Sequence, residues 1–200
     1  MGQLWQGSTH EKTAEDVKAF FERVAADWDG MRLAYYDERV IEKMVEISGV
    51  GGATTVADVG TGTGFVAVGA ASRAGRVVAV DNSRAMLNVA RANLDALGLP
   101  NVELIEGEVT ALPLASGSVD AAFANMVMHH AEEPAAVLEE MARVVKPGGS
   151  VAVVDAVEHR YEWMREEHAD IRLGFGREQI EGLFGAARLE EIGYESLGMQ

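Results

Sequence analysis

Apolar residues recur at helical spacing along the first fifty residues of the chain. Within Ala14–Trp28 they fall three and four positions apart, which places them on one face of a helix. The same spacing in Leu33–Ile47 predicts a second helix, which the glycine-rich cluster Ser48–Gly52 ends. Both helices precede the first expected strand, so residues 1–48 are interpreted as an N-terminal helical cap or lid.

Short runs rich in valine and alanine alternate with helical stretches through the middle of the chain. This alternation predicts an α/β fold, with a doubly wound, mostly parallel, Rossmann-like sheet and helices on both faces. Residues 49–200 are expected to form this single globular unit. The expected strands are Thr54–Val59, Arg76–Asp81, Val102–Glu106, Ser118–Asn125 and Ser150–Asp155, and the expected helices are Phe65–Ser72, Ser83–Leu97 and Pro134–Val145.

The last fifty residues carry a weaker pattern. It predicts a charged helical stretch at His159–Arg172, a helix near Arg177–Ala187 and a strand-like run over about Leu189–Leu197. Parallel sheets of this class bind ligands beyond the carboxyl ends of their strands. The residues that follow the expected strands are therefore the candidates for a functional site.

The charge balance narrows the choice of partners. The 200 residues carry a formal net charge of −15, and a surface this acidic repels phosphate backbones and anionic lipids. We therefore expect no nucleic-acid or membrane partner, although solubility alone explains an acidic surface equally well. No apolar run approaches the roughly 20 residues of a membrane span. Residues 1–12 also lack the apolar stretch of a signal peptide.

The sequence contains no cysteine. Disulfides, thiolate zinc sites and cysteine nucleophiles are therefore excluded. The absence also fits a reducing compartment. Together with the lack of a signal peptide, it leads us to expect a soluble, cytoplasmic protein.

A glycine-rich turn follows the first expected strand, in the segment DVGTGTG that begins at Asp58. Its glycines allow positive φ and close backbone approach, and the helix N-terminus that follows offers free amides. Dinucleotide-binding turns read G-x-G-x-x-G, whereas the third glycine here, Gly64, comes one residue early. The carboxylate of Asp58 would repel a diphosphate but accepts hydrogen bonds from an amino group, which favours a zwitterionic ligand. Taken by itself, the motif has an alternative interpretation, in which the glycines serve only the geometry of a tight turn and bind no ligand.

Acidic residues also follow the second and third expected strands. Asp81 comes about 20 residues after the glycines, where a carboxylate is placed to hold ribose hydroxyls. Capping of the helix that begins near Ser83 is the alternative role for Asp81. After the third strand, Glu108 or the amide of Val109 could contact an adenine edge, and a solvated loop is the alternative there.

The order of these segments resembles the class I S-adenosylmethionine (SAM)-dependent methyltransferases, in the branch with ubiquinone- and menaquinone-pathway and other small-molecule enzymes. The similar segments are DVGTGTG, VVAVD, GEVTALPL, SVDAAFANMVMHH and VKPGG, within about Phe20–Asp155. The resemblance implies methyl transfer from SAM to a small-molecule acceptor, with S-adenosyl-L-homocysteine as product. A catalytically idle SAM-binding sensor or scaffold is the alternative. A nucleotide-dependent oxidoreductase is disfavoured by the early third glycine and by Asp58.

The resemblance also implies a set of cofactor contacts along the carboxyl ends of the strands. The methionine portion of SAM would lie on the glycine turn beside Asp58, and the ribose would lie on Asp81. The adenine would lie beside Glu108, and the sulfonium beside Asn125. The full set is Asp58, Gly60, Thr61, Gly62, Gly64, Asp81, Asn82, Met86, Glu108, Val109, Asn125 and Met126. The segment Lys146–Gly149 matches a turn that is structural in this family.

Residues near the expected position of the methyl group are the candidates for catalysis. His129 and His130 follow the fourth strand, where an imidazole could take a proton from the acceptor or simply shape the pocket. Packing or helix capping is the alternative for both. In this family a segment like the N-terminal cap forms part of the acceptor pocket, which makes Tyr35 and Tyr36 candidates to line it. No compact ligand spacing is evident, so no metal site is expected.

Two departures from the family limit the interpretation. Arsenite methyltransferases hold arsenic through cysteine thiolates, so the absence of cysteine excludes that activity. The family fold has seven strands and ends in a hairpin, but only the run Leu189–Leu197 remains before Gln200. We therefore expect the last strand to be missing, which leaves the sheet edge and a homodimer contact open.

Overall fold

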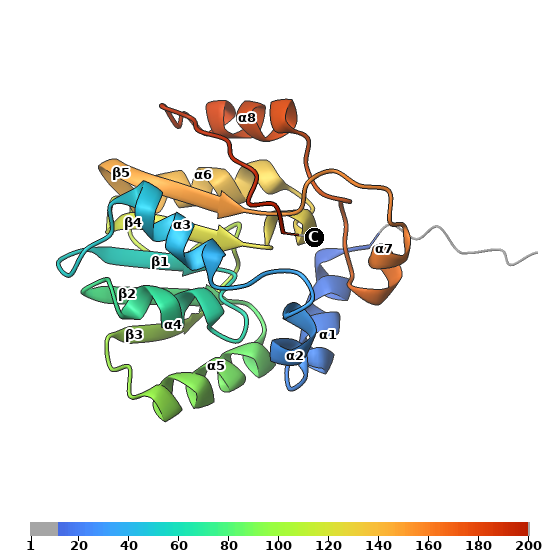
Figure 1. Cartoon of the computed structure of the whole chain (residues 1–200), viewed down its shortest axis with the longest axis horizontal. Coiled ribbons are helices and arrows are strands. Elements are labelled where there is room, and N and C mark those ends of the chain that lie inside the picture. The colour runs from blue at the N-terminus through green and yellow to red at the C-terminus, as the bar shows by residue number, and fades with distance from the viewer. Residues whose placement is uncertain (1–11, 200) are drawn as a thin grey trace, which may run out of the picture.

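The computed structural model describes residues 12–199 of the chain. Five parallel strands form one sheet in the order β3-β2-β1-β4-β5, with helices on both faces (Figure 1). The expected doubly wound α/β class is confirmed. The strands are β1 Thr55–Val59, β2 Arg76–Asp81, β3 Val102–Glu106, β4 Val119–Asn125 and β5 Val145–Val154. The helices are α1 Ala14–Val24, α2 Trp28–Arg32, α3 Arg39–Ser48, α4 Phe65–Ala71, α5 Arg84–Leu97, the 3-10 turn η1 Met128–His130, α6 Pro134–Val144, α7 Trp163–Glu167 and α8 Arg177–Ala186.

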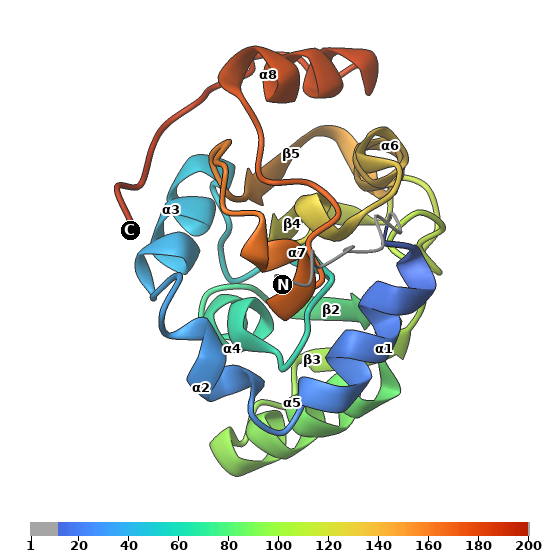
Figure 2. The ribbon, with the colours of Figure 1, turned by 90° about the vertical axis from the view of Figure 1, so that its right-hand side faces the viewer.

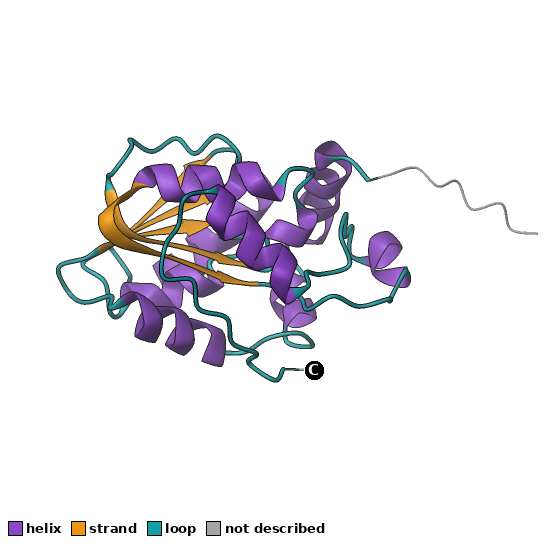
Figure 3. Ribbon diagram, turned by 90° about the horizontal axis from the view of Figure 1, so that it is seen from above, coloured by secondary structure: helices purple, strands orange, loops and turns teal. Residues whose placement is uncertain are grey.

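Helices lie on opposite sides of the strands in Figure 3, and a separate hydrophobic core fills the space on each face of the sheet. Val56 and Phe123 face α3 and α4, where they pack with Met44. Val59 faces the other side and packs with Leu138 of α6. Successive strand side chains point to opposite faces, and because both faces are covered the central residues of β1, β2 and β4 are mostly apolar.

The expected N-terminal cap contains two kinds of helix. In α3, Val40 and Met44 have no exposed surface and belong to the core against the sheet. By contrast, α1 lies beside α5 at the carboxyl edge of the sheet, and α2 follows it there (Figure 2). A capping box begins α1, in which Thr13 Oγ1 accepts from the backbone nitrogen of Asp16 at 3.2 Å. The helices α1 and α2 are therefore the part of the chain placed to cover a ligand, while the boundary at residue 48 stays a prediction.

The irregular segment Lys146–Gly149 lies inside β5, not before it. Val145 pairs with Val119 and Ser150 pairs with Ala121, so the four residues between them interrupt the register. Gly148 has φ +79°, and a Cβ on Gly149 would collide with the carbonyl oxygen of Asp120. The two glycines therefore let the strand resume after the interruption.

After β5, two of the elements predicted from the sequence differ from those observed. The helical stretch expected at His159–Arg172 is limited to α7, and the strand expected over Leu189–Leu197 does not form: within residues 12–199 no strand follows β5. Positive φ values at Arg188 and Glu191 interrupt the extended backbone that a strand requires. The chain instead returns beside α3 as a loop (Figure 1), where Lys43 Nζ lies 2.8 Å from Glu195 Oε2.

Candidate functional site

The glycine turn, Gly60–Gly64, joins β1 to α4 and has three glycines with positive φ. The values are +70° at Gly60, +54° at Gly62 and +89° at Gly64. A Cβ on Gly60 would lie 2.6 Å from Val127 Cγ2, and one on Gly64 would lie 3.3 Å from Ala90 Cβ. Gly60 and Gly64 are therefore required by close packing as well as by φ, whereas a Cβ on Gly62 would meet only Trp28 Nε1, at an ordinary contact distance of 3.9 Å.

A cavity of about 340 Å³, called here the first cavity, opens on this turn at the carboxyl ends of β1, β2 and β4. Of the cofactor contacts implied by the resemblance, only Gly64 lies outside its lining, because Gly64 packs α4 against α5. Among the candidates near the methyl group, Tyr36 and His130 line the cavity and Tyr35 and His129 do not. The predicted contacts that line it are Asp58, Gly60, Thr61, Gly62, Asp81, Asn82, Met86, Glu108, Val109, Asn125 and Met126.

Asp58 lies at the end of β1 with only 1% of its surface exposed. Burial raises the pKa of its carboxyl group to about 7, although the hydroxyl of Thr61 donates to Oδ2 at 2.6 Å and opposes the shift. The neighbouring carboxylate of Asp81 raises it further. A cation in the first cavity would therefore interact strongly with Asp58.

Asp81 is oriented through both of its carboxylate oxygens. The backbone nitrogen of Gly62 donates to Oδ2 and that of Ser83 donates to Oδ1, each at 2.8 Å. Each oxygen keeps a lone pair for a further donor. The cap of α5 is Ser83, whose Oγ accepts from the backbone nitrogen of Met86 at 3.2 Å. Asp81 is therefore free to face a ligand.

Asn125 and Met126 end β4 beside the cavity. Asn125 Oδ1 is buried, and no residue that the structure describes donates a hydrogen bond to it. A buried acceptor without a donor is costly, and a ligand donor in the first cavity would remove that cost. Met126 takes φ +56°, which is unusual for a residue with a side chain.

Residues of α2 lie against the glycine turn, a contact that the spacing of its aromatic residues does not reveal. Asp29 accepts from Thr63 Oγ1 at 2.7 Å, from Asn93 Nδ2 at 3.0 Å and from Arg32 Nε at 3.2 Å. Burial acts to raise the pKa of Asp29, but these three hydrogen bonds lower it. Trp28 lines the first cavity above Gly62. The helix α2 is thus tied to the turn by a charged network.

The two adjacent histidines have different surroundings. His130 lines the first cavity, packs edge-on against Phe21 at 5.0 Å between ring centroids, and has a pKa that burial holds well below its ordinary value. His129 is buried, with Nδ1 2.7 Å from Asp155 Oδ1. Burial acts to lower the pKa of His129, but the carboxylates of Asp155 and Asp170 raise it. Only His130 is placed to contact a ligand in the first cavity.

A second cavity, of about 560 Å³, shares Tyr36 and Met126 with the first. Its other walls come from the end of β5, α7, α8 and residues 192–199, and include Trp163 and Phe184. Tyr35 belongs to this second cavity, and its Oη lies 2.8 Å from His168 Nε2. The second cavity therefore depends on the segment after β5, where the sequence carried no recognisable motif.

The chain is similar in sequence to known methyltransferases. Residues 57–153 match a family described as a methyltransferase domain. The chain is 34% identical over 149 residues to a demethylmenaquinone methyltransferase of Renibacterium salmoninarum, which covers 72% of this chain and 60% of that enzyme. It is 38% identical over 107 residues to an arsenite methyltransferase of Halobacterium salinarum, which covers 52% of this chain and 27% of that enzyme. The chain therefore spans only part of these curated relatives.

A solved structure supports the same relationship. A SAM-dependent methyltransferase from Aquifex aeolicus superposes with a TM-score of 0.64 at 27% identity, over 88% of this chain and 87% of that one. The likeness thus extends beyond the matched domain to most of the described fold.

Proposed function

Because the chain belongs to the class I SAM-dependent methyltransferases, we propose that it binds SAM in the first cavity and transfers the methyl group to a small-molecule acceptor. The observation that carries this proposal is the pair of carboxylates, the buried Asp58 and the part-buried Asp81, that line the first cavity beside the glycine turn. A zwitterionic ligand with ribose hydroxyls satisfies both of them, whereas a diphosphate would be repelled.

Each part of the cofactor has a matching group in the first cavity. The ammonium group would be held by Asp58, and the two ribose hydroxyls by the oriented oxygens of Asp81. The unpartnered Oδ1 of Asn125 supports the fit, since it needs a donor in this cavity. The adenine would lie beside Met86 and Val109, which both line the first cavity.

The protein's part in the reaction is mainly to position the acceptor and exclude water. Bound SAM supplies a methyl group on a sulfonium, which is strongly electrophilic because a neutral thioether leaves. Phe21 and Trp28 line the cavity from α1 and α2 and would keep water from the methyl group. A base is needed only if the acceptor must lose a proton. We propose that His130 shapes the acceptor side of this cavity, and that His129, held by Asp155, has a structural role.

The second cavity is the proposed place for the acceptor. It adjoins the first through Tyr36 and Met126, and aromatic and aliphatic side chains such as Trp163 and Phe184 line it. These walls favour an apolar ring system such as a quinone or a phenol. Tyr35, which also lines this cavity, is the proposed polar contact for such a ring.

Arsenite is not a proposed acceptor, although an arsenite methyltransferase is among the relatives. The 200 residues contain no cysteine to hold arsenic, and the shared 107 residues are only 27% of that enzyme. Among residues 12–199, no helix has the length and apolar character needed to cross a membrane. The cytoplasmic location and the homodimer stay predictions.

Calorimetry with SAM and with its demethylated product tests the proposal first. Dissociation constants in the micromolar range support it, and no heat with either compound would overturn it. Mass spectrometry after incubation with SAM and a panel of quinones, phenols and amines then tests transfer. Binding without any methylated product would favour the idle sensor or scaffold, and binding of NAD but not SAM would favour an oxidoreductase.

A further inference from the structure

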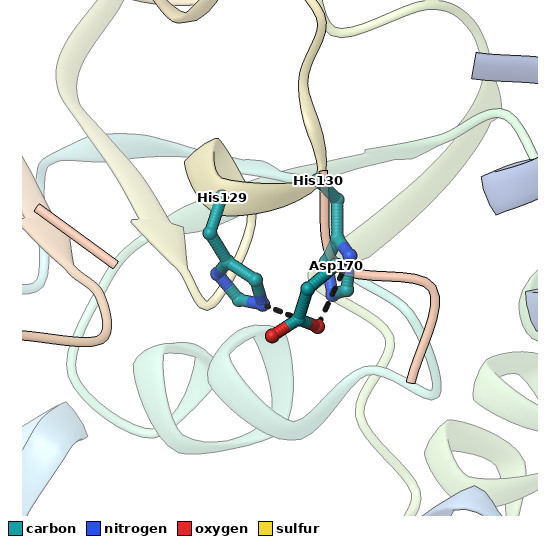
Figure 4. Close-up of side chains that lie close together, drawn as sticks. All are labelled: His129, His130 and Asp170. Atoms are coloured by element: carbon teal, nitrogen blue, oxygen red, sulfur yellow. Dashed lines mark ion pairs between the residues drawn. The ribbon is translucent and has the colours of Figure 1, made fainter. Parts of the chain in front are cut away.

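Three side chains from two distant segments of the chain converge, as Figure 4 shows, and one of them, His130, also lines the first cavity. His129 and His130 belong to η1, and Asp170 belongs to the loop after α7. Asp170 Oδ1 lies 3.6 Å from His129 Nε2 and 3.9 Å from His130 Nδ1. One nitrogen or oxygen atom from each of the three residues lies within 4.8 Å of the others.

The carboxylate of Asp170 lacks the partners that a buried charge requires. Only 1% of the residue is exposed, and neither of its oxygens has a hydrogen-bond partner among the residues that the structure describes. The preceding residue, Ala169, takes φ +60°, a strained conformation for an alanine. A strained backbone that presents an unsatisfied carboxylate to two imidazoles indicates that a further group completes this cluster.

The two imidazoles are prepared to act as ligands. His129 Nδ1 lies 2.7 Å from Asp155 Oδ1, and the backbone nitrogen of Met128 donates to Asp155 Oδ2 at 2.9 Å. A carboxylate that accepts from one ring nitrogen fixes the tautomer and leaves Nε2 with its lone pair, as in carboxylate–histidine–metal groups. His130 presents its Nδ1 toward Asp170, at 3.9 Å from Oδ1. Its Nδ1 has only a long contact, 3.4 Å, with the carbonyl oxygen of Ala169.

The separations suit a shared cation better than direct hydrogen bonds. Distances of 3.6 Å and 3.9 Å exceed the range of a nitrogen–oxygen hydrogen bond. Two ligands that each bind a metal at about 2.1 Å stand no more than about 4.2 Å apart. The distances from Asp170 to both rings fall within this limit, and the three ligand atoms lie within 4.8 Å of one another, so a metal ion fits among them after small shifts of the side chains.

We propose that His129, His130 and Asp170 bind one divalent transition-metal ion of the class that favours two imidazoles and one carboxylate, such as Zn²⁺. Two nitrogen ligands disfavour Mg²⁺ and Ca²⁺, which take oxygen. The sequence alone does not indicate this site, because Asp170 lies on a different segment from the histidine pair.

The ion would connect the segment after β5 to the end of β4. The backbone nitrogens of Ile171 and Arg172 already donate to the carbonyl oxygen of His129 at 3.1 Å and 2.9 Å. A metal ion at Asp170 would strengthen this junction, and His130 would bring it next to the first cavity. The inference goes beyond methyl transfer and does not depend on it.

Metal analysis of the purified protein tests the site without any assay of activity. The full chain is stripped with a chelator, dialysed, reloaded with Zn²⁺ or Co²⁺ and measured by mass spectrometry of the metal. We expect one ion per chain, and visible absorption bands from bound Co²⁺. Failure of the native protein to retain either ion would overturn the proposal.

Matched variants locate the ligands. Asp170→Asn and His129→Gln should each weaken metal binding by at least tenfold, and Asp155→Asn should weaken it by about 10- to 100-fold. Glu166→Gln is the control, because it removes a carboxylate from an exposed position of α7 in the same region and lies outside the three ligands. Circular dichroism verifies that each variant is folded. Equal metal content in Asp170→Asn and the native chain would contradict the assignment, as would an anomalous scattering peak of zinc away from the three side chains.

Discussion

Tyr35 Oη lies 2.8 Å from His168 Nε2, and this contact joins residues 133 positions apart in the chain. The two rings also meet edge-on, with 5.2 Å between centroids. His168 makes similar edge contacts with Phe20 of α1 and Trp163 of α7. The N-terminal helices and the segment after β5 therefore hold each other in place beside both cavities.

Removal of the Tyr35 hydroxyl should loosen this junction. We expect Tyr35→Phe to lower the free energy of unfolding by about 1 kcal/mol, because one partly buried hydrogen bond is lost. Amide hydrogen exchange of residues 163–170 should become faster while exchange in the sheet stays unchanged. Chemical denaturation and exchange mass spectrometry measure the two effects. Tyr161→Phe, at a tyrosine that is 60% exposed, is the control. Unchanged exchange in Tyr35→Phe would show that the contact does not hold the segment.

Substitution of Asp81 should reduce the affinity for SAM. A hydrogen bond to a charged group contributes about 1.5–3 kcal/mol, so Asp81→Asn should raise the dissociation constant by about 10- to 100-fold. Asp95→Asn removes an equal charge from the exposed side of α5 and should leave the constant unchanged. Calorimetry gives both values. A native-like constant for Asp81→Asn would remove Asp81 from the proposed ribose site.

The raised pKa of Asp58 should make SAM binding dependent on pH. The carboxyl group is neutral in the free protein below pH about 7 and ionised above it, and the ammonium of SAM favours the ionised form. The dissociation constant should therefore fall as pH rises from 5 to 7, by about tenfold per unit, and then level off. Protons should be released on binding near pH 6, which calorimetry in buffers of different ionisation enthalpy detects.

The same group should affect the stability of the free protein with the opposite trend. Its pKa in the folded state exceeds the unfolded value of 3.8, so its contribution to stability is present below that pH and is lost as pH rises through about 7. Asp58→Asn should abolish this loss and flatten the pH dependence of SAM binding. An equally steep dependence in Asp58→Asn would assign the effect to another group.

The glycine turn should tolerate substitution far less well than glycines in helices. Gly60 has φ +70°, and an added Cβ would lie 2.6 Å from Val127, so Gly60→Ala should cost about 1–3 kcal/mol of stability. Gly182 of α8 has open space at the Cβ position, and Gly182→Ala should stabilise the helix by about 0.5–1 kcal/mol. Thermal unfolding of the two variants tests this contrast. A loss of stability in Gly182→Ala similar to that in Gly60→Ala would contradict the interpretation.

The pattern of apolar and polar residues predicted the strand bounds well where a strand is covered on both faces and bounded by turn residues. The observed bounds of β2 and β3 equal the predicted ones, and β1 and β4 differ from them by one residue at their starts. The pattern failed after β5, where short polar and glycine-containing runs have no periodicity strong enough to distinguish a strand from a loop. The strand expected over Leu189–Leu197 does not form, although β5 lies at an edge of the sheet, because the positive φ values at Arg188 and Glu191 interrupt the extended backbone.

The sequence by itself determined the succession of strands and helices along the chain, the glycine turn and the position of Asp58 and Asp81 at strand ends. These features are local, since a strand, its turn and the next helix N-terminus are set by residues a few positions apart. Only the tertiary structure decided that His130 faces the first cavity, that His129 turns toward Asp155, and that Asp170 meets both. Those contacts join distant segments, and they depend on how the segment after β5 packs on the sheet, which no short-range pattern specifies.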